Sequence, residues 1–544
     1  MTAQARWAAR IVGGLVAGGV RHVVASPGSR STPFLLAVLA RDELTVHDVV
    51  DERVAGFYAL GIARVTEAPP LLLCTSGSAA GHYLPAVMEA SAAELPLLVL
   101  SADRPAELHD LGANQTTDQQ HLFGVHARAF FELGAAADGE EVLAGAEARA
   151  LQAATRARYP WPGPVHLNAR ARKPLEERAA PRDSSTRIFV PSARPDPDGL
   201  AWARARLARA RRPAVVMGPA PVRARALRPV LRRFLSAVGA PLIADATSQM
   251  RFTGEGLAVA RSALALRTEV GRRRFDADLL VQVGAPPIDA GYAAWAKGRP
   301  RLVLSAGAPA DPGASAEAFL LGDLGALLEG LAEMPARPPW WGPLPPLPGS
   351  RVLAPGAVAA AVVRASAEGS ILALGNSVAA RAIDRHVGED RDLAVLHQRG
   401  LSGIDGLVAG AAGAARVSGR PVTLLLGDLS LLHDLGGLAT LRGLRTPFRV
   451  VVVNDDGGRI FEQLPVYERT SAPEFERHFA MAHGLEFRAA ARFFGLDYRR
   501  VEAIDAIEDA LAGEDVRVVE VPVEPGAARR ELVEALGAAE ARWA

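Results

Sequence analysis

The sequence predicts an α/β protein made of three doubly wound parallel sheets, each with helices on both faces. Short, continuously apolar segments alternate with helical patterns, and two proline-rich segments divide this alternation into three regions. Strands that are buried on both faces of a parallel sheet appear in a sequence as continuous apolar runs. At about 100–200 residues per domain, a chain of 544 residues is long enough for three such regions.

In the first region, polar loops follow directly after the predicted strands. Segments 20–25, 71–74 and 97–100 are expected to be strands, and segments 54–64 and 79–92 helices. The apolar residues 11–20 resemble a weak signal peptide but lack its small-residue cleavage site, so they are expected to belong to a first helix. Open α/β sheets bind ligands at the carboxyl ends of their strands, which is where these polar loops begin.

Two linkers separate the remaining regions. Residues 176–199 are rich in Pro, Ser, Arg and Asp, and residues 335–355 are dense in proline, as is typical of linkers. Strands are expected at 213–217, 240–244, 279–283 and 302–304, and then at 371–374, 422–426, 449–453 and 516–521. The domains are therefore predicted at residues 1–180, 195–335 and 350–544.

Composition argues against several classes of partner and site. The 61 basic and 60 acidic side chains give a net charge of +1, which is no reason to expect nucleic acid or an anionic membrane as partner. No apolar run reaches the roughly 18 residues of a membrane span, so a cytoplasmic protein is expected. Cys74 is the single cysteine, which excludes an intrachain disulfide; we predict a buried, unreactive side chain.

Two acidic turns in the last region form the clearest candidate site. The strand at 422–426 runs into Gly-Asp-Leu-Ser (427–430), and the strand at 449–453 runs into Asn-Asp-Asp-Gly-Gly (454–458). In a parallel sheet both turns lie at one edge, where Asp428 and Asp455 offer hard oxygen ligands to a small divalent cation. Gly457 lets its backbone carbonyl turn inward, and the glycines allow backbone amides to approach a phosphate. Each turn taken alone is equally consistent with a purely structural role.

The pair of turns resembles the cofactor-binding motif of thiamine diphosphate enzymes. The usual form runs from Gly-Asp-Gly to Asn-Asn, whereas this chain has Leu429 at the third position and Asp455 for the second Asn. The resemblance implies that Mg²⁺ or Mn²⁺ is held by Asp428, Asp455 and Gly457. It also implies that Glu52 hydrogen-bonds the aminopyrimidine ring of the cofactor, a role that needs a carboxyl group in a dry pocket. A glutamate at a helix start otherwise complements the helix dipole.

Longer stretches narrow the resemblance to one family. The chain carries Ser-Pro-Gly-Ser-Arg-Ser-Thr-Pro at 26–33, Asp-Glu-Arg at 51–53, Thr-Ser-Gly at 75–77, Ala-Asp-Arg-Pro at 102–105, Gly-Ala-Asn-Gln at 112–115, Gly-Asn-Ser at 375–377, Arg-Gly at 399–400 and Ser-Gly-Ile-Asp-Gly at 402–406. Together they resemble the 2-succinyl-5-enolpyruvyl-6-hydroxy-3-cyclohexene-1-carboxylate synthases of menaquinone biosynthesis. The resemblance covers the first and last thirds well and the middle third weakly. It implies pyrimidine-binding, central and diphosphate-binding domains of the thiamine diphosphate enzyme type.

The resemblance also implies an activity and a set of site residues. The expected enzyme is a transferase that decarboxylates 2-oxoglutarate and adds the resulting succinyl semialdehyde carbanion to isochorismate. Both substrates are dicarboxylates, and arginine is the side chain best shaped to bind a carboxylate through two hydrogen bonds. The residues implied as catalytic are Glu52, Arg399 and Gln115, and those implied as substrate-binding are Ser29, Arg30, Arg104, Asn114, Ser377 and Arg381. The cofactor is assigned to Glu52, Ser76, Gly77, Ser402, Ile404, Asp428, Leu429, Ser430, Asp455, Gly457, Gly458 and Ile460.

In this family the two halves of one site come from different subunits, so a homodimer or homotetramer is implied. The middle region departs from the family pattern, because residues 283–292 contain no lysine to reach a substrate carboxylate. Two other functions remain open. A 2-oxoacid decarboxylase or an acetolactate synthase type would share Glu52 and the metal motif but would not need the arginines. A nucleotide-binding regulatory protein would keep the fold without turnover.

Overall fold

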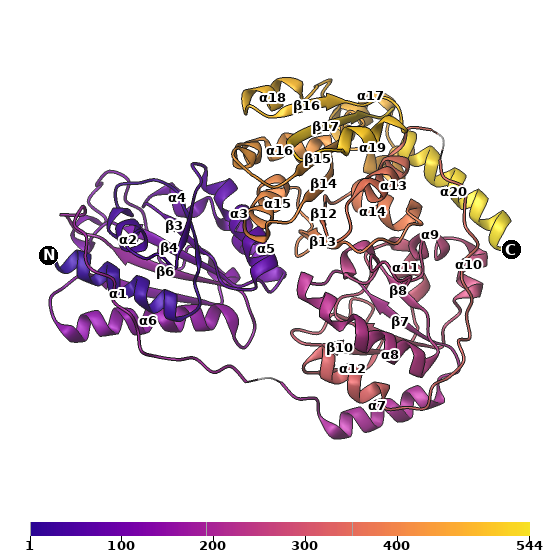
Figure 1. Ribbon diagram of the computed structural model, residues 1–544, viewed down its shortest axis with the longest axis horizontal. Coiled ribbons are helices and arrows are strands. Elements are labelled where there is room, and N and C mark those ends of the chain that lie inside the picture. Colours follow the sequence, from indigo (N-terminus) through magenta and orange to yellow (C-terminus); the bar gives the residue numbers. More distant parts are fainter. Residues whose placement is uncertain (1, 192, 351) are drawn as a thin grey trace. The chain divides into compact units, whose positions relative to one another are not determined.

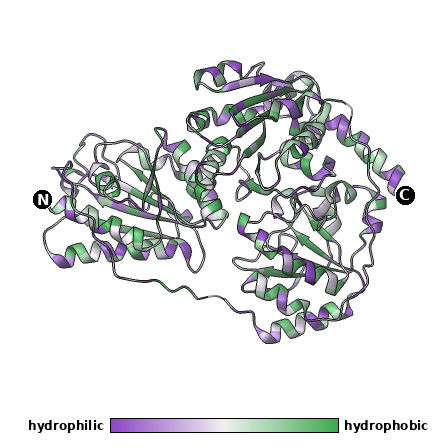
Figure 2. Cartoon of the chain, in the orientation of Figure 1, coloured by the Kyte–Doolittle hydropathy of each residue, from purple (hydrophilic) through white to green (hydrophobic). Residues whose placement is uncertain are grey.

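The structure is a computed structural model that describes residues 2–191, 193–350 and 352–544, and it contains three parallel sheets (Figure 1). Every strand pairing in the three sheets is parallel. The fold class predicted from the alternating apolar segments is therefore confirmed. In Figure 2 the hydrophobic colour follows the strands, as expected for sheets that are covered on both faces.

The first sheet is six-stranded and doubly wound. Its strands are β1 (His22–Ala25), β2 (Thr45–Asp48), β3 (Leu71–Cys74), β4 (Leu97–Asp103), β5 (Ala129–Ala135) and β6 (Pro164–Arg170), in the order β2-β1-β3-β4-β6-β5. The helices of this region are α1 (Ala3–Ala17), α2 (Thr32–Val38), α3 (Glu52–Thr66), α4 (Ser78–Gly81), α5 (Leu84–Ala92) and α6 (Glu140–Arg158). Helices α1 and α6 pack together over one face, and α3 and α5 pack together on the strands as well.

Two details of the first region differ from the prediction. The single helix expected at 79–92 is divided into α4 and α5, because Pro85 lies in the first turn of α5 and cannot continue a preceding helix. The strands β2, β5 and β6 were not expected. Strands β2 and β5 lie at the edges of the sheet and are only partly buried, so their sequences lack the continuous apolar run that marks a central strand. Strand β6 is buried inside the sheet, but His166 and Asn168 interrupt its apolar run.

The middle sheet is five-stranded. Its strands are β7 (Pro213–Met217), β8 (Leu242–Ala244), β9 (Leu279–Val283), β10 (Arg301–Ser305) and β11 (Ala316–Leu321), in the order β11-β10-β9-β7-β8. The helices here are α7 (Pro197–Arg209), α8 (Arg228–Val238), α9 (Ser262–Ala265), α10 (Glu269–Arg274), α11 (Ala290–Ala296) and α12 (Leu324–Ala332). The four expected strands are present. The edge strand β11 was missed, since it alternates exposed and partly buried residues.

The third sheet repeats the strand order of the first. Its strands are β12 (Ile371–Leu374), β13 (Ala394–His397), β14 (Val422–Gly427), β15 (Phe448–Asn454), β16 (Asp497–Arg500) and β17 (Val516–Pro522), in the order β13-β12-β14-β15-β17-β16. The helices are α13 (Pro355–Ala365), α14 (Val378–His386), α15 (Leu407–Ser418), α16 (Asp428–His433), α17 (Ala472–Phe475), α18 (Arg488–Phe493), α19 (Ala506–Leu511) and α20 (Ala527–Trp543). Because β14 pairs with both β12 and β15, the loops after these three strands leave the same edge.

The chain divides into two compact units. The first contains residues 1–190, 398–419 and 433–443, and the second contains residues 191–397, 420–432 and 444–544. Helix α15 therefore belongs to the first unit, where it crosses α3 so closely that a Cβ at Gly61 would lie 1.8 Å from the carbonyl oxygen of Gly410. Within the described ranges, no helix combines the length and the apolar character needed to cross a lipid bilayer.

Candidate functional site

In the first unit, the loops after β1, β3 and β4 bring two arginines together with polar residues. Arg104 donates from its guanidinium to Ser76 Oγ and, at 3.5 Å, to Gln115 Oε1. Ser76 and Gln115 exchange two further hydrogen bonds, from Gln115 Nε2 to the Ser76 carbonyl (2.9 Å) and from Ser76 Oγ to the Gln115 carbonyl (3.1 Å). Arg30 donates to the carbonyl oxygen of Ala171 at 2.7 Å. We call Arg30, Ser76, Arg104 and Gln115 the arginine cluster.

The arginine cluster carries positive charge that neighbouring acids only partly balance. Burial and the charge of Arg104 lower the pKa of Arg30, and Asp103 partly offsets this effect. Asp103 is fully buried and is already engaged, because it accepts hydrogen bonds from the Arg104 backbone N–H (2.7 Å) and from Asn168 Nδ2 (3.0 Å). Among the described residues, neither guanidinium donates to a carboxylate, so the cluster is suited to an anionic ligand.

Gln119 is a member of this site that the sequence did not indicate. Its side chain is fully buried, accepts a hydrogen bond from Gly77 N–H at 3.0 Å and donates to Asn168 Oδ1 at 2.9 Å. Gly77 has φ +87°, and a Cβ there would lie 2.8 Å from Gln115 Cγ, so the close packing of the loops requires glycine. By contrast, Ser29 and Asn114 are exposed on these loops rather than packed into the cluster.

Glu52 is the first residue of α3, which Asp51 caps by accepting from the Arg53 N–H at 2.9 Å. Its half-buried carboxylate lies close to Cys74 and Tyr83. Burial raises the pKa of the Cys74 thiol and of the Tyr83 hydroxyl, and the negative charge of Glu52 raises both pKa values further. Cys74 is fully buried, as predicted. Two neighbours of Glu52 are therefore fully out of water, while Glu52 itself is half-buried.

The loop between β13 and α15 carries Arg399, Ser402 and Ile404. Arg399 and Ile404 are half-buried, while Ser402 is exposed and has φ +61°. The loop ends at Gly406, where a Cβ would lie 2.0 Å from Cγ of Phe57 in α3. The structure thus packs this loop against the helix that begins with Glu52.

In the second unit, the two predicted acidic turns meet. Asp428 Oδ2 accepts a hydrogen bond from Gly457 N–H at 2.8 Å, and its Oδ1 accepts one from Leu429 N–H at 2.6 Å. Both Asp428 and Asp455 are buried. Burial raises the pKa of Asp428; burial, followed by the nearby charge of Asp428, raises the pKa of Asp455 well above its usual range. We call Asp428 and Asp455 the acidic pair.

The acidic pair fits a divalent cation, because two buried carboxylates that repel each other are stabilised by a positive charge between them. His483 Nε2 lies 3.1 Å from Asp428 Oδ2, a contact that no sequence pattern indicated. Within the described ranges, no three His, Cys, Asp or Glu side chains are grouped as metal ligands. A metal here would therefore also need backbone oxygen, phosphate or water.

The remaining predicted residues of the second unit lie around these turns. Gly457 has φ +118°, and a Cβ there would be 2.2 Å from the Ala480 carbonyl oxygen, so this turn requires glycine. Gly458 N–H donates to the same carbonyl at 2.6 Å. Ser430 is buried and Ile460 is half-buried. Ser377 and Arg381 lie after β12, and Arg381 donates to the Ser377 carbonyl at 2.8 Å.

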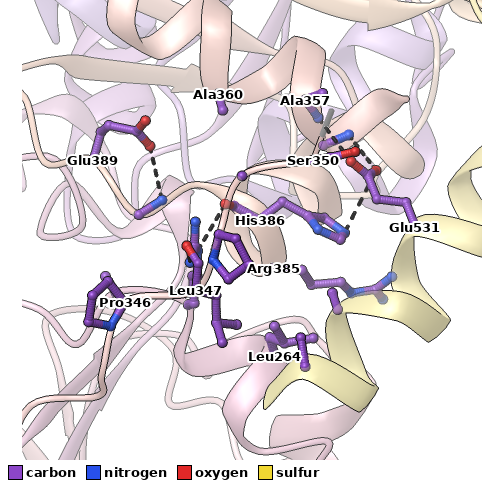
Figure 3. A pocket seen from close by; sticks show the side chains of 18 of the residues that line it. Leu264, Pro346, Leu347, Ser350, Ala357, Ala360, Arg385, His386, Glu389 and Glu531 are labelled. Carbon is purple, nitrogen blue, oxygen red and sulfur yellow. Dashed lines mark hydrogen bonds and ion pairs between the residues drawn. The ribbon is translucent and has the colours of Figure 1, made fainter. Parts of the chain in front are cut away.

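A cavity of about 640 Å³ lies elsewhere in the second unit and contains none of the predicted site residues (Figure 3). Glu531 of α20 accepts hydrogen bonds there from the N–H groups of Gly356 (2.7 Å) and Ala357 (3.0 Å) at the start of α13. Burial raises the pKa of Glu531 to about 7 and lowers that of the neighbouring His386 to about 3. The polar groups of this cavity attach the C-terminal helix to α13.

Comparison with known proteins identifies the family. Residues 6–122 match the family described as "Thiamine pyrophosphate enzyme, N-terminal TPP binding domain", and residues 377–521 match its C-terminal TPP binding domain. A 2-succinyl-5-enolpyruvyl-6-hydroxy-3-cyclohexene-1-carboxylate synthase from Sorangium cellulosum is 42% identical, with 98% of this chain and 97% of the relative covered. The chain belongs to the 2-succinyl-5-enolpyruvyl-6-hydroxy-3-cyclohexene-1-carboxylate synthase family.

A second member of this synthase family, from Halobacterium salinarum, is 34% identical over 96% of both chains. The crystal structure of benzoylformate decarboxylase from Polynucleobacter necessarius is similar in fold, with a TM-score of 0.75, 20% identity, and coverage of 96% of this chain and 99% of that chain. The predicted family and the predicted thiamine diphosphate enzyme fold are confirmed. The matched thiamine-pyrophosphate-binding domains also support thiamine diphosphate as the cofactor of this synthase family member.

Proposed function

We propose that this chain is a 2-succinyl-5-enolpyruvyl-6-hydroxy-3-cyclohexene-1-carboxylate synthase of menaquinone biosynthesis. It decarboxylates 2-oxoglutarate, releases CO₂ and adds the resulting succinyl semialdehyde carbanion to isochorismate. The observation that carries this proposal is the arginine cluster, whose guanidinium groups donate to neutral oxygens and so retain positive charge for dicarboxylates. The relative from Sorangium cellulosum, which bears this name, supports it.

Thiamine diphosphate would supply the carbanion chemistry of the reaction, and the protein would bind, orient and exclude water. Asp428, Asp455 and the carbonyl of Gly457 would hold Mg²⁺ or Mn²⁺ against the diphosphate. The backbone of Leu429 and the other residues assigned to the cofactor would surround the thiamine diphosphate. Besides Glu52 and these four, the residues assigned to the cofactor are Ser76, Gly77, Ser402, Ile404, Ser430, Gly458 and Ile460. The burial and mutual repulsion of the acidic pair support this assignment.

Glu52 would hold the proton that is exchanged with the aminopyrimidine ring of the cofactor. Its position against the buried Cys74 and Tyr83 supports that role, since a carboxyl group shares a proton best where water is excluded. Arg399 and Gln115 would act on the reacting substrates. Ser29, Arg30, Arg104, Asn114, Ser377 and Arg381 would grip their carboxylates and hydroxyls.

The three sheets would correspond to a pyrimidine-binding domain (1–180), a central domain (195–335) and a diphosphate-binding domain (350–544). The smallest active unit would be a cytoplasmic homodimer in which Glu52 of one subunit completes the metal-bound half of the other. The central loop at 283–292 would not bind substrate through a lysine. Its Asp289 is buried instead in ion pairs with Arg267 and Arg385.

The proposal is tested by turnover of the purified protein with thiamine diphosphate, Mg²⁺, 2-oxoglutarate and isochorismate. We expect CO₂ and the adduct in equal amounts. Release of CO₂ without adduct would indicate a 2-oxoacid decarboxylase. An absence of both, in a protein that binds the cofactor, would indicate a regulatory protein. Glu52→Gln should bind the cofactor normally and lose turnover by at least about 100-fold, so near-normal turnover of this variant would reject its role.

A further inference from the structure

The loop that carries Arg399 is bound by a carboxylate from another part of the first unit. Glu89, near the C-terminal end of α5, is 4% exposed. Its Oε1 accepts a hydrogen bond from Gly400 N–H at 3.0 Å, and its Oε2 accepts one from Leu401 N–H at 2.7 Å. These N–H groups belong to the two residues that directly follow Arg399, so one side chain fixes the backbone on which Arg399 is mounted.

Glu89 is itself held by a buried cation. Arg64 of α3 donates to Glu89 Oε1 at 2.6 Å, and the two side chains are 7% and 5% exposed. Burial lowers the pKa of Arg64, and the charge of Glu89 opposes that effect. A buried ion pair of this kind depends on both partners, because removal of one leaves an uncompensated charge in the interior. Arg64 thus holds the Glu89 carboxylate in the orientation that its charge-assisted bonds to the loop require.

Side-chain packing contributes little to the position of this part of the loop. A cavity of about 120 Å³ lies against it, lined in part by Met88, Glu89 and Leu401. The side chain of Leu401 is 52% exposed. Gly400 approaches α5 so closely that a Cβ would lie 2.8 Å from Glu89 Oε2 and 2.9 Å from the Glu89 carbonyl oxygen. Hydrogen bonds to Glu89, rather than apolar contacts, therefore set the distance between loop and helix.

The two ends of the same loop are also tied to each other. Gln398 Nε2 donates to the carbonyl oxygens of Asp405 (3.2 Å) and Gly406 (2.9 Å). Glu89 thus fixes residues 400 and 401, whereas Gln398, the residue before Arg399, ties the start of the loop to its end. Loss of the Glu89 bonds should therefore disturb the backbone that directly follows Arg399.

We propose that the buried Arg64–Glu89 ion pair is a positioning device for Arg399, and that it sets how well the enzyme uses its dicarboxylate substrates. This inference rests on the proposed function, in which Arg399 acts on the substrates. Glu89 and Arg64 touch neither substrate nor cofactor in this account; they act through the backbone of residues 400 and 401.

The first test is Glu89→Gln in the holoenzyme, with KM measured for 2-oxoglutarate and for isochorismate. Gln keeps the shape of the side chain but loses the charge and one acceptor oxygen, so KM for at least one substrate should rise by about tenfold or more. The dissociation constant of thiamine diphosphate with Mg²⁺ should change by less than about threefold. Unchanged KM values, or an equal weakening of cofactor and substrates, would overturn the inference.

The second test separates positioning from stability. The single variant Arg64→Met should lower the melting temperature and raise KM, because it leaves Glu89 buried without its cation. In Arg64→Met/Glu89→Leu the buried charges are gone, so the melting temperature should recover, while KM stays raised because Gly400 and Leu401 have lost their acceptor. Recovery of KM together with the melting temperature would show a merely structural role and would overturn the inference.

A third variant changes the loop itself, and a fourth serves as control. Gly400→Ala keeps both members of the ion pair in the chain, but its Cβ would press against Glu89 and push the loop away from α5, so it should raise KM as Glu89→Gln does; a normal KM would count against the inference. The control is Glu147→Gln, which breaks the pair between Arg10 and Glu147 (2.8 Å, both 13% exposed) that joins α1 to α6. This control should lower the melting temperature without changing KM. Failure of the wild-type enzyme to form the adduct would instead contradict the proposed function.

Discussion

The arginine cluster of the first unit and the acidic pair of the second unit have opposite charges but share one property. In each, groups of like charge lie close together and partly or wholly out of water. Burial and the charge of Arg104 lower the pKa of Arg30, whereas burial and the charge of Asp428 raise the pKa of Asp455. The like charges within each cluster therefore repel each other, and a ligand of the opposite charge would stabilise the cluster.

The two clusters differ in how their own chain supports them. Arg104 is positioned by the neutral oxygens of Ser76 and Gln115, which leave its charge available to a ligand. Asp428 is positioned by two backbone N–H groups and by His483, which favour its ionised form. The first arrangement suits carboxylates that arrive and leave, and the second suits a resident cation. Mutations that change one cluster should therefore separate substrate use from cofactor binding.

The largest effect is expected for Asp428→Ala. Asp428 accepts a hydrogen bond from Gly457 and is the metal ligand of the proposed function, so the affinity for thiamine diphosphate with Mg²⁺ should fall by at least about 100-fold. The measurement is a cofactor titration followed by fluorescence or calorimetry. Near-normal affinity would show that the acidic pair is not the metal site.

Arg104→Ala should have the next largest effect and should act in the opposite sense. In the proposed function the substrate then loses a charge-assisted partner, so KM should rise by about 10–100-fold, while cofactor affinity stays within about threefold of wild type. Steady-state kinetics with each substrate varied in turn measures this. The matched control is Arg172→Ala, which removes an exposed arginine paired with Glu107 and should leave both constants unchanged. Loss of cofactor binding in Arg104→Ala would contradict the distinction between the two clusters.

Asp455→Asn tests repulsion within the acidic pair. Asn keeps an oxygen ligand but removes one of the two buried negative charges, so the metal-free protein should gain about 1–3 kcal/mol of unfolding free energy at neutral pH. Cofactor binding with Mg²⁺ should persist. Chemical denaturation of metal-free protein measures the difference, and a loss of stability would show that the two carboxylates do not repel each other.

Glu531 is a buried carboxylate that belongs to neither cluster, and Glu531→Gln tests how its burial affects the pH dependence of stability. Burial raises the pKa of Glu531 from 4.5 to about 7, so its folded form holds the proton more tightly than its unfolded form. Its contribution to stability is present below about pH 4.5 and is lost as the pH rises through about 7, a difference of about 3 kcal/mol at most. Glu531→Gln should flatten this part of the stability profile, measured by denaturation between pH 4.5 and 8. The exposed Glu514→Gln serves as control and should leave the profile unchanged.

The sequence predicted the acidic pair more completely than the rest of the site. Asp428 and Asp455 directly follow strands with continuous apolar runs, and parallel neighbours bring their carboxyl ends to one edge. The edge strands β2, β5, β11 and β16 lacked that signal because they are only partly buried, and the buried strands β6 and β13 were also missed. The prediction for the interior of the sheets was therefore better than that for their edges.

The residues that support the site could not be predicted in the same way. Gln119, His483 and Glu89 lie 42, 55 and 311 positions along the chain from the groups that they bind. They occur in irregular segments or within a helix, where neither periodicity nor a strand end marks them. Their partners follow from tertiary packing, which a reading of local patterns does not contain.

The central claim is that Glu52 and Asp428 act together across a subunit interface. It is tested most directly by co-expressing Glu52→Gln and Asp428→Ala chains with different tags and assaying the purified heterodimer for adduct formation. Each homodimer should be inactive. The heterodimer should have one intact site and about half of the wild-type turnover per dimer, because one subunit supplies Glu52 and the other Asp428. An inactive heterodimer would contradict the account, because each site would then draw both residues from a single chain.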